Sequence, residues 1–178
     1  MRGTHGDRLV DLTGLRPWLT LAHVLGAFGF VAVHGVSMVV LLRLRTERDR
    51  ARVRTLLDLS SSTIGLLYGF LSLLLLAGIL SGIAGGWWTS GQLWIWAAVL
   101  VLVLVFGAMY GLLTTYYIRL RNAVGIAGPQ DVKKGIVPVE LPDDELAVLL
   151  ASKRPLIGAA VGIVGIVVIV WLMVAKPF

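Results

Sequence analysis

The chain has 178 residues, of which 57% are hydrophobic and only 15% are charged, and its mean hydropathy is +0.88. An ordinary soluble domain carries far more charge, so lipid is the predicted solvent. The net charge of +6 does not indicate a nucleic-acid partner, because the basic residues flank the apolar stretches, where they meet lipid headgroups. The absence of cysteine excludes disulfides, thiolate metal sites and cysteine nucleophiles.

Four apolar stretches contain no Asp, Glu, Lys or Arg, and each is long enough to cross the hydrocarbon layer, which takes about 20 helical residues. They are residues 18–42, 63–84, 93–118 and 156–174. The first stretch is longer than the roughly 7–15 apolar residues of a signal peptide and lacks a small-residue cleavage site, so we expect it to be retained. The predicted fold class is therefore all-α, an integral membrane four-helix bundle that forms a single transmembrane domain over residues 1–178.

The one sizeable extramembrane segment is the loop of residues 122–155. Its first part is rich in Gly and Pro, whereas residues 142–154 begin with acids and end with bases, which is typical of a short amphipathic helix. We expect this helix to lie on the membrane surface as a connector before the last span. A role in docking a partner protein is the alternative.

The basic residues are distributed unevenly between the loops. Twelve of the sixteen fall in residues 43–54 and in the segment after the third span, whereas residues 85–92 carry no charge. By the positive-inside rule, both termini of this predicted cell-membrane protein face outward, and the loops of residues 43–54 and 122–155 are cytoplasmic. The arginines of residues 43–54 would then meet anionic lipid headgroups. The six tryptophans all fall at the opposite interface, as indole side chains prefer the headgroup level: Trp18, Trp87, Trp88, Trp94, Trp96 and Trp171.

Glycines spaced four residues apart recur within the spans and predict close approach of helix backbones. Such pairs allow the van der Waals contact that drives helix association in lipid. We expect them to pack the helices of one chain together, with a homodimer seam or a larger membrane complex as the alternative. The pairs are Gly65 with Gly69, Gly78 with Gly82, Gly107 with Gly111, and Gly158 with Gly162.

Histidine is the only ionisable residue type other than tyrosine inside the spans, so a proton relay or cation path built on carboxylates is not expected. His23 and His34 are eleven residues apart, which places them on one helix face, about 20° from alignment. They lie roughly 16 Å apart along the axis and therefore cannot ligate the same metal ion. Each would need a ligand partner from another helix or another subunit.

His34 is the stronger ligand candidate because it lies near the middle of its span. Met38 follows one turn later, and Met109 of the third span is expected at a similar depth. An imidazole with one or two thioethers suits haem b or cuprous copper. The alternative is a histidine that packs or donates a hydrogen bond to a backbone carbonyl or to a hydroxyl such as that of Tyr68. No nucleophile–base pair or phosphate-binding turn is recognisable, so an enzymatic role is not favoured.

Residues 21–27 (Leu-Ala-His-Val-Leu-Gly-Ala), followed by Gly35, the arginine-rich loop and Trp94 with Trp96, resemble small four-helix bacterial membrane proteins near the copper-resistance D type. That group includes families of unknown function. The resemblance implies an intramembrane histidine on the first helix associated with haem or copper, here His23. The chain differs from the group at Phe28 to Phe30, where a tryptophan–glycine pair is often found, and it has no histidine on its later helices.

Two functions follow from these patterns. The favoured one is a non-catalytic accessory or structural subunit of the cell membrane, in which the histidines only pack. The alternative is a haem b- or copper-associated membrane protein that uses His34 or His23.

Overall fold

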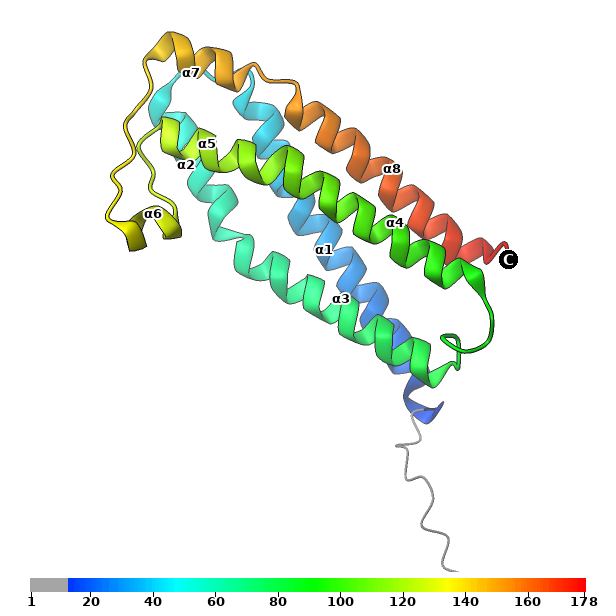
Figure 1. Ribbon diagram of the computed structural model, residues 1–178. Coiled ribbons are helices and arrows are strands. Elements are labelled where there is room, and N and C mark those ends of the chain that lie inside the picture. The colour runs from blue at the N-terminus through cyan, green and yellow to red at the C-terminus, as the bar shows by residue number, and fades with distance from the viewer. Residues whose placement is uncertain (1–12) are drawn as a thin grey trace, which may run out of the picture.

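The computed structural model describes residues 13–178, which form helices joined by loops and contain no strand (Figure 1). The elements in chain order are η1 (Thr13–Leu15), α1 (Arg16–Leu44), α2 (Arg50–Ser62), α3 (Ile64–Ala84), α4 (Leu93–Met109), the π-helical η2 (Tyr110–Thr114), α5 (Thr115–Ala123), α6 (Pro129–Lys134), α7 (Asp143–Leu150) and α8 (Arg154–Ala175). Four helices are long and apolar enough to cross a membrane, as predicted. The predicted outward-facing N-terminal tail, with Arg2 and Arg8, lies outside the described residues.

Local chemistry sets the ends of these helices. Proline occupies the first turn of α1 and of α8, where its missing N–H costs no hydrogen bond. Asp49 caps α2 by accepting a hydrogen bond from the Ala51 N–H at 2.9 Å. In the preceding turn, the Glu47 carboxylate accepts the N–H groups of Asp49 and Arg48, which lowers the pKa of Glu47. The long helices therefore start and stop within a few residues of the predicted span limits.

The long helices pack mainly as two pairs, α1 against α3 and α4 against α8. In the first pair, Gly26 lies so close to α3 that a Cβ atom there would come within 2.7 Å of the Leu74 backbone nitrogen. In the second pair, the glycines of α8 receive side chains from α4 and η2: Gly158 faces Leu113, Gly162 faces Met109, and Gly165 faces Val105. Glycine at these positions is what permits the close helix contact.

The π turn keeps this second pair in register. Successive i, i+4 steps along an α-helix drift by about 40°, so Val105, Met109 and Leu113 would gradually turn away from α8. The wider turn of η2 reverses that drift, and Leu113 meets Gly158.

The prediction that all four glycine pairs pack within the chain is wrong for two of them. Gly78 and Gly82 on α3, and Gly158 and Gly162 on α8, lie against other side chains of the protein. A Cβ atom placed on the four other glycines would meet no atom within 4 Å. These outward-facing glycines are Gly65 and Gly69 on α3 and Gly107 and Gly111 on α4. Spacing alone does not distinguish the pairs, because it fixes a helix face but not what lies opposite that face.

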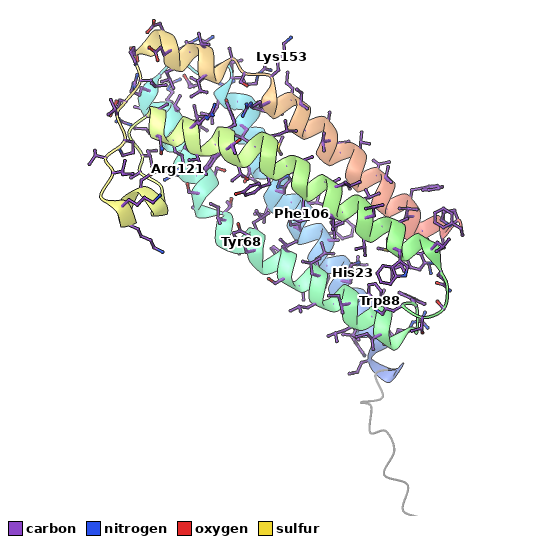
Figure 2. The ribbon with its side chains drawn as sticks, in the orientation of Figure 1. His23, Tyr68, Trp88, Phe106, Arg121 and Lys153 are labelled. Atoms are coloured by element: carbon purple, nitrogen blue, oxygen red, sulfur yellow. The ribbon has the colours of Figure 1, made fainter. Side chains whose placement is uncertain are left out.

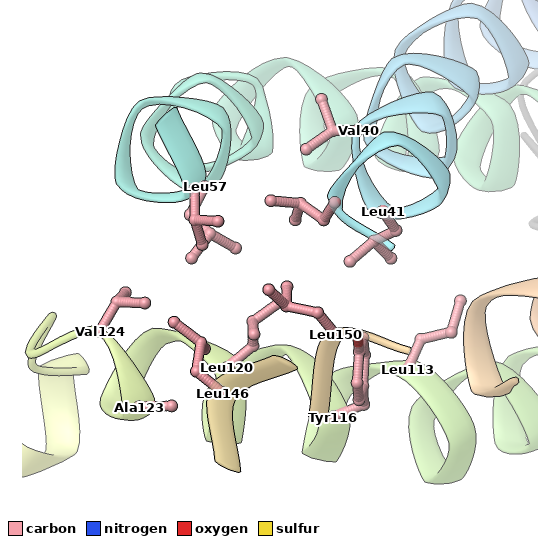
Figure 3. Packing of buried hydrophobic residues seen from close by; sticks show 12 residues of the cluster. Val40, Leu41, Leu57, Leu113, Tyr116, Leu120, Ala123, Val124, Leu146 and Leu150 are labelled. Carbon is pink, nitrogen blue, oxygen red and sulfur yellow. The ribbon is translucent and has the colours of Figure 1, made fainter. Parts of the chain in front are cut away.

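The main buried cluster lies at the end of the molecule that carries α7, and we call it the α7-end cluster (Figure 3). Side chains from α1 and α2 meet side chains from η2, α5 and α7 there. Its members are Val40, Leu41, Leu44, Val53, Leu57, Leu113, Tyr116, Leu120, Ala123, Val124, Leu146 and Leu150. Helix α7 contributes Leu146 and Leu150, so its apolar face covers the ends of the long helices rather than facing lipid.

Candidate functional site

His23 lies in the seam between α1 and α3 (Figure 2). Its Nδ1 atom is 2.8 Å from the backbone oxygen of Leu74. Because a carbonyl oxygen only accepts hydrogen bonds, Nδ1 carries the proton and donates, which leaves Nε2 as the acceptor in the neutral ring. The imidazole packs on Gly78, where a Cβ atom would come within 2.7 Å of Nδ1. His23 therefore has the hydrogen-bonded arrangement that the sequence offered as the alternative to a ligand.

A second polar contact lies one turn further along the same seam. The hydroxyl oxygens of Thr20 and Ser81 are 3.1 Å apart, and Ser81 is buried. Together with the His23–Leu74 hydrogen bond, this contact satisfies polar side chains where α1 and α3 approach each other. Hydrogen bonds between helices are a common means of holding membrane helices together.

His34 is half-buried and stacks on an aromatic ring. The centroids of Phe30 and His34 are 5.5 Å apart, with only 7° between their planes. Phe30 also lies against Phe106 of α4, with centroids 6.1 Å apart, so this side of α1 faces α4. Within the described part of the chain, the ring of His34 makes no hydrogen bond. Tyr68, the proposed acceptor, is 62% exposed on α3.

Met38 and Met109 both pack against the α7-end cluster, and Met109 also lies against Gly162 of α8. A haem iron or copper ion at His34 would have to draw on these sulfurs, whose side chains already fill helix contacts. Residues 13–178 contain no group of three or more His, Cys, Asp or Glu side chains that could hold a metal ion. A ligand role for His34, Met38, Met109 or His23 stays a prediction.

Two shallow hollows on the surface of the long helices are apolar and lack histidine. One runs along α8 from Ile166 to Ala175, and the other lies between α4 and α8 around Gly165. Their walls are aliphatic side chains and one tryptophan, Trp171. Such walls suit acyl chains or another helix better than a polar substrate.

The most elaborate polar site is one that the sequence did not predict, and it lies at the base of the segment that joins α5 to α7. Arg50 of α2 donates to the backbone oxygens of Leu141 (2.6 Å) and Ala123 (3.4 Å) and to the carboxylates of Asp143 (2.6 Å) and Glu140 (3.2 Å). We call these residues, together with Arg54, the arginine network. A guanidinium group with five donors suits such a set of carbonyl and carboxylate acceptors.

Arg54 extends the arginine network one helical turn further along α2. Its Nε donates to the Val124 backbone oxygen at 2.8 Å, and its guanidinium also binds Glu140. Arg45 donates from Nε to the Ser152 backbone oxygen at 3.0 Å. Three of the six arginines expected at lipid headgroups, Arg45, Arg50 and Arg54, therefore bind acceptors on distant segments of the chain. The acidic partners of Arg50 and Arg54 are 86 to 93 residues distant in sequence, which is why the pattern of residues 43–54 alone gave no signal.

A smaller polar cluster joins α2 to α5. The Tyr117 hydroxyl is 2.9 Å from the Leu57 backbone oxygen and 3.0 Å from the Ser61 hydroxyl, and Arg121 also donates to Ser61. The Arg121 guanidinium lies 5.9 Å from the centroid of the Tyr117 ring. These contacts tie α2 to the end of the third span.

The opposite end of the molecule, which we call the Trp87 end, gathers aromatic and cationic side chains. Trp87 and Trp94 meet edge to face with centroids 5.7 Å apart. The Arg16 guanidinium lies 5.0 Å from the Trp87 centroid, and the Lys176 ammonium lies 5.3 Å from Trp87 and 5.4 Å from Trp94. Cation–π contacts of this kind join the start of α1, the end of α8 and the loop between α3 and α4.

No family model, curated protein or solved structure matches the chain. The resemblance to the copper-resistance D type therefore stays a prediction.

Proposed function

We propose that the chain is a multi-pass protein of the cell membrane, a four-helix bundle that serves as a non-catalytic accessory or structural subunit. The observation that carries this proposal is the set of outward-facing glycines, Gly65 and Gly69 on α3 and Gly107 and Gly111 on α4. In lipid, helices associate where small residues allow backbones to approach closely. These two faces are therefore suited to helices of another subunit, either a second copy of this chain or a different membrane protein.

The polar groups within the spans support the same proposal. The His23 imidazole and the Thr20 and Ser81 hydroxyls all bind groups on the neighbouring helix. Such contacts hold the helices of one chain together, which is the packing role that the accessory proposal gives to His23.

A haem b- or copper-associated protein is the second candidate, and His34 is the observation that favours it. Its ring is half-buried and makes no hydrogen bond to the described residues. In this candidate, His34 would supply an imidazole ligand, with Met38 or Met109 as a thioether ligand, and the bound iron or copper would supply redox chemistry.

One preparation tests both candidates. The protein is purified from its native membrane in mild detergent, and its haem absorption, its copper content and the mass of the assembly are measured. We expect neither haem nor stoichiometric copper, and a mass well above the 19.2 kDa of one chain. Gly69→Leu and Gly111→Leu should reduce that mass without unfolding the single chain, because both glycines face outward.

The opposite result would identify the second candidate. A single-chain particle that contains stoichiometric haem or copper, and loses it in His34→Ala but not in Tyr68→Phe, would overturn the accessory proposal.

A further inference from the structure

The segment between α5 and α7 forms a finger that leaves the helical assembly and returns to it (Figure 1). We call residues 126–139, with α6 at the tip, the α6 finger. Its base is closed by a hydrogen bond from the Leu141 N–H to the Ala123 backbone oxygen at 3.0 Å. The arginine network binds both sides of the same base through Ala123, Val124 and Leu141. The finger therefore projects from a fixed base.

Branched aliphatic side chains on the finger are exposed although they lie outside the four long helices. Val137 is 84% exposed and Val139 is 85% exposed, and Val132 and Ile136 are also exposed. The hydrocarbon core around the spans explains exposed apolar side chains on the long helices, but that core does not extend past the ends of the spans. A cluster of this kind in water indicates a surface that something covers.

The charges on the finger point to an anionic occupant. Lys133 and Lys134 are both exposed, and neither pairs with a carboxylate among the described residues. Asp131 accepts the Gly128 N–H at 3.0 Å and so belongs to the turn that starts α6. Glu140, at the foot of the finger, binds Arg50 and Arg54.

The finger projects to one side of the helical assembly. Figure 1 shows α6 (yellow) set off to the side of the assembly at the end that carries α2 and α7, while α7 lies over that end. A membrane that surrounds the four long helices would therefore have its headgroup layer close to the finger. Aliphatic side chains next to lysines match that layer, which takes apolar groups at its inner edge and cations at its phosphates.

We infer that the α6 finger docks on the surface of the bilayer that the long helices cross. Lys133 and Lys134 bind anionic phospholipid headgroups, and Val132, Ile136, Val137 and Val139 enter the interfacial layer. This inference rests on the proposed membrane location but not on the accessory role.

Single cysteines in this cysteine-free chain test the inference. The full-length protein carries Val137→Cys or, as a matched control, Val148→Cys, a valine 77% exposed on α7. Each is labelled with a fluorophore and reconstituted in nanodiscs of phosphatidylcholine, with or without phosphatidylglycerol and with a nitroxide quencher attached to the lipid headgroup. We expect quenching in anionic discs to be at least about twofold stronger at residue 137 than at residue 148.

The two lysines should account for the dependence on anionic lipid. A lysine near an anionic membrane surface contributes about fivefold to the ratio of docked to undocked finger, so Lys133→Gln with Lys134→Gln should remove most of the added quenching. Equal quenching at residues 137 and 148, or quenching indifferent to phosphatidylglycerol, would overturn the inference. It would also be overturned if residue 137 were shielded from aqueous iodide in native membranes but open in nanodiscs, which would identify a protein partner. None of these outcomes depends on the mass or the haem content of the assembly. The proposed function and the docking of the α6 finger can therefore be tested independently of each other.

Discussion

The two histidines of α1 differ in the contacts that their rings make. His23 donates a hydrogen bond to the Leu74 backbone oxygen and fills the space beside Gly78. Both the N–H group and the size of the ring therefore contribute to the contact between α1 and α3. His34 stacks on Phe30 and makes no hydrogen bond to the described residues, so its ring contributes only an aromatic packing contact. Sequence spacing placed both on one face, but it could not show this difference because Leu74 is 51 residues away from His23.

We expect a difference in stability between matched substitutions at the two histidines. His23→Phe should lower the free energy of unfolding by about 0.5–2 kcal/mol, because it removes an interhelical hydrogen bond and a larger ring must fit against Gly78. His34→Phe should change it by less than about 0.5 kcal/mol, because phenyl stacks on Phe30 as imidazole does. Thermal unfolding of both variants in the same detergent measures the contrast. If His34→Phe lowered the free energy of unfolding more than His23→Phe did, His34 would have to make a stabilising polar contact in addition to its stacking on Phe30.

At the scale of helices, glycine has two roles in this chain that its spacing does not separate. On α1, Gly26 lets the α3 backbone approach, whereas on α3 itself Gly69 faces outward with nothing near it. Both belong to apolar helices with almost uniform hydrophobicity around the axis, so no polar face marks which side is buried.

Alanine scanning separates the two roles. Gly26→Ala should destabilise the protein by about 1–3 kcal/mol, because the new methyl group would lie against the Leu74 backbone, which cannot move aside as a flexible side chain can. Gly69→Ala should change the free energy of unfolding by less than about 1 kcal/mol, since the added methyl group meets open space and alanine favours helix. Denaturation in a detergent that dissociates the assembly compares them, so that a subunit contact at Gly69 does not enter. Equal losses would then mean that Gly69 is packed within the chain and does not face outward.

The joint between α2 and the α6 finger depends on Arg50. Its side chain is 23% exposed and binds two backbone oxygens and two carboxylates, whereas Arg52 is 72% exposed and pairs only with Asp49. Arg50→Gln should lower the free energy of unfolding by about 2–3 kcal/mol and speed proteolytic cleavage within residues 126–139. Arg52→Gln should cost no more than about 1 kcal/mol and leave cleavage unchanged. If both variants were cleaved at the wild-type rate, the base of the finger would be held without Arg50, by the Leu141–Ala123 hydrogen bond and by Arg54.

At the scale of the whole molecule, the sequence predicted the features that depend on neighbouring residues in the chain. Four helices long enough to span a membrane follow from continuous apolar stretches, and the short helix α7 follows from the acids at residues 143–145. The pairing of α1 with α3 and of α4 with α8, the α7-end cluster and the arginine network all join residues far apart in the chain. Nothing in a single sequence pairs Arg50 with Asp143, since many arginines and acids flank the spans. The sequence likewise predicted the depth of the candidate ligands His34, Met38 and Met109 but not which side chains they contact.

The charge distribution predicts how the whole molecule is oriented, and two exposed residues at opposite ends make this testable. Thr46 lies in the turn between α1 and α2, near the arginine network, and Ser90 lies in the uncharged loop at the Trp87 end. Lys and Arg near span ends are retained in the cytoplasm during insertion, so the α7 end should be inside and the Trp87 end outside. On intact cells, an impermeant thiol reagent should label Ser90→Cys and leave Thr46→Cys unlabelled until the membrane is opened. Because the chain has no other cysteine, labelling at residue 46 alone would mean that the molecule is inserted the other way, and the α6 finger would then face the outer leaflet.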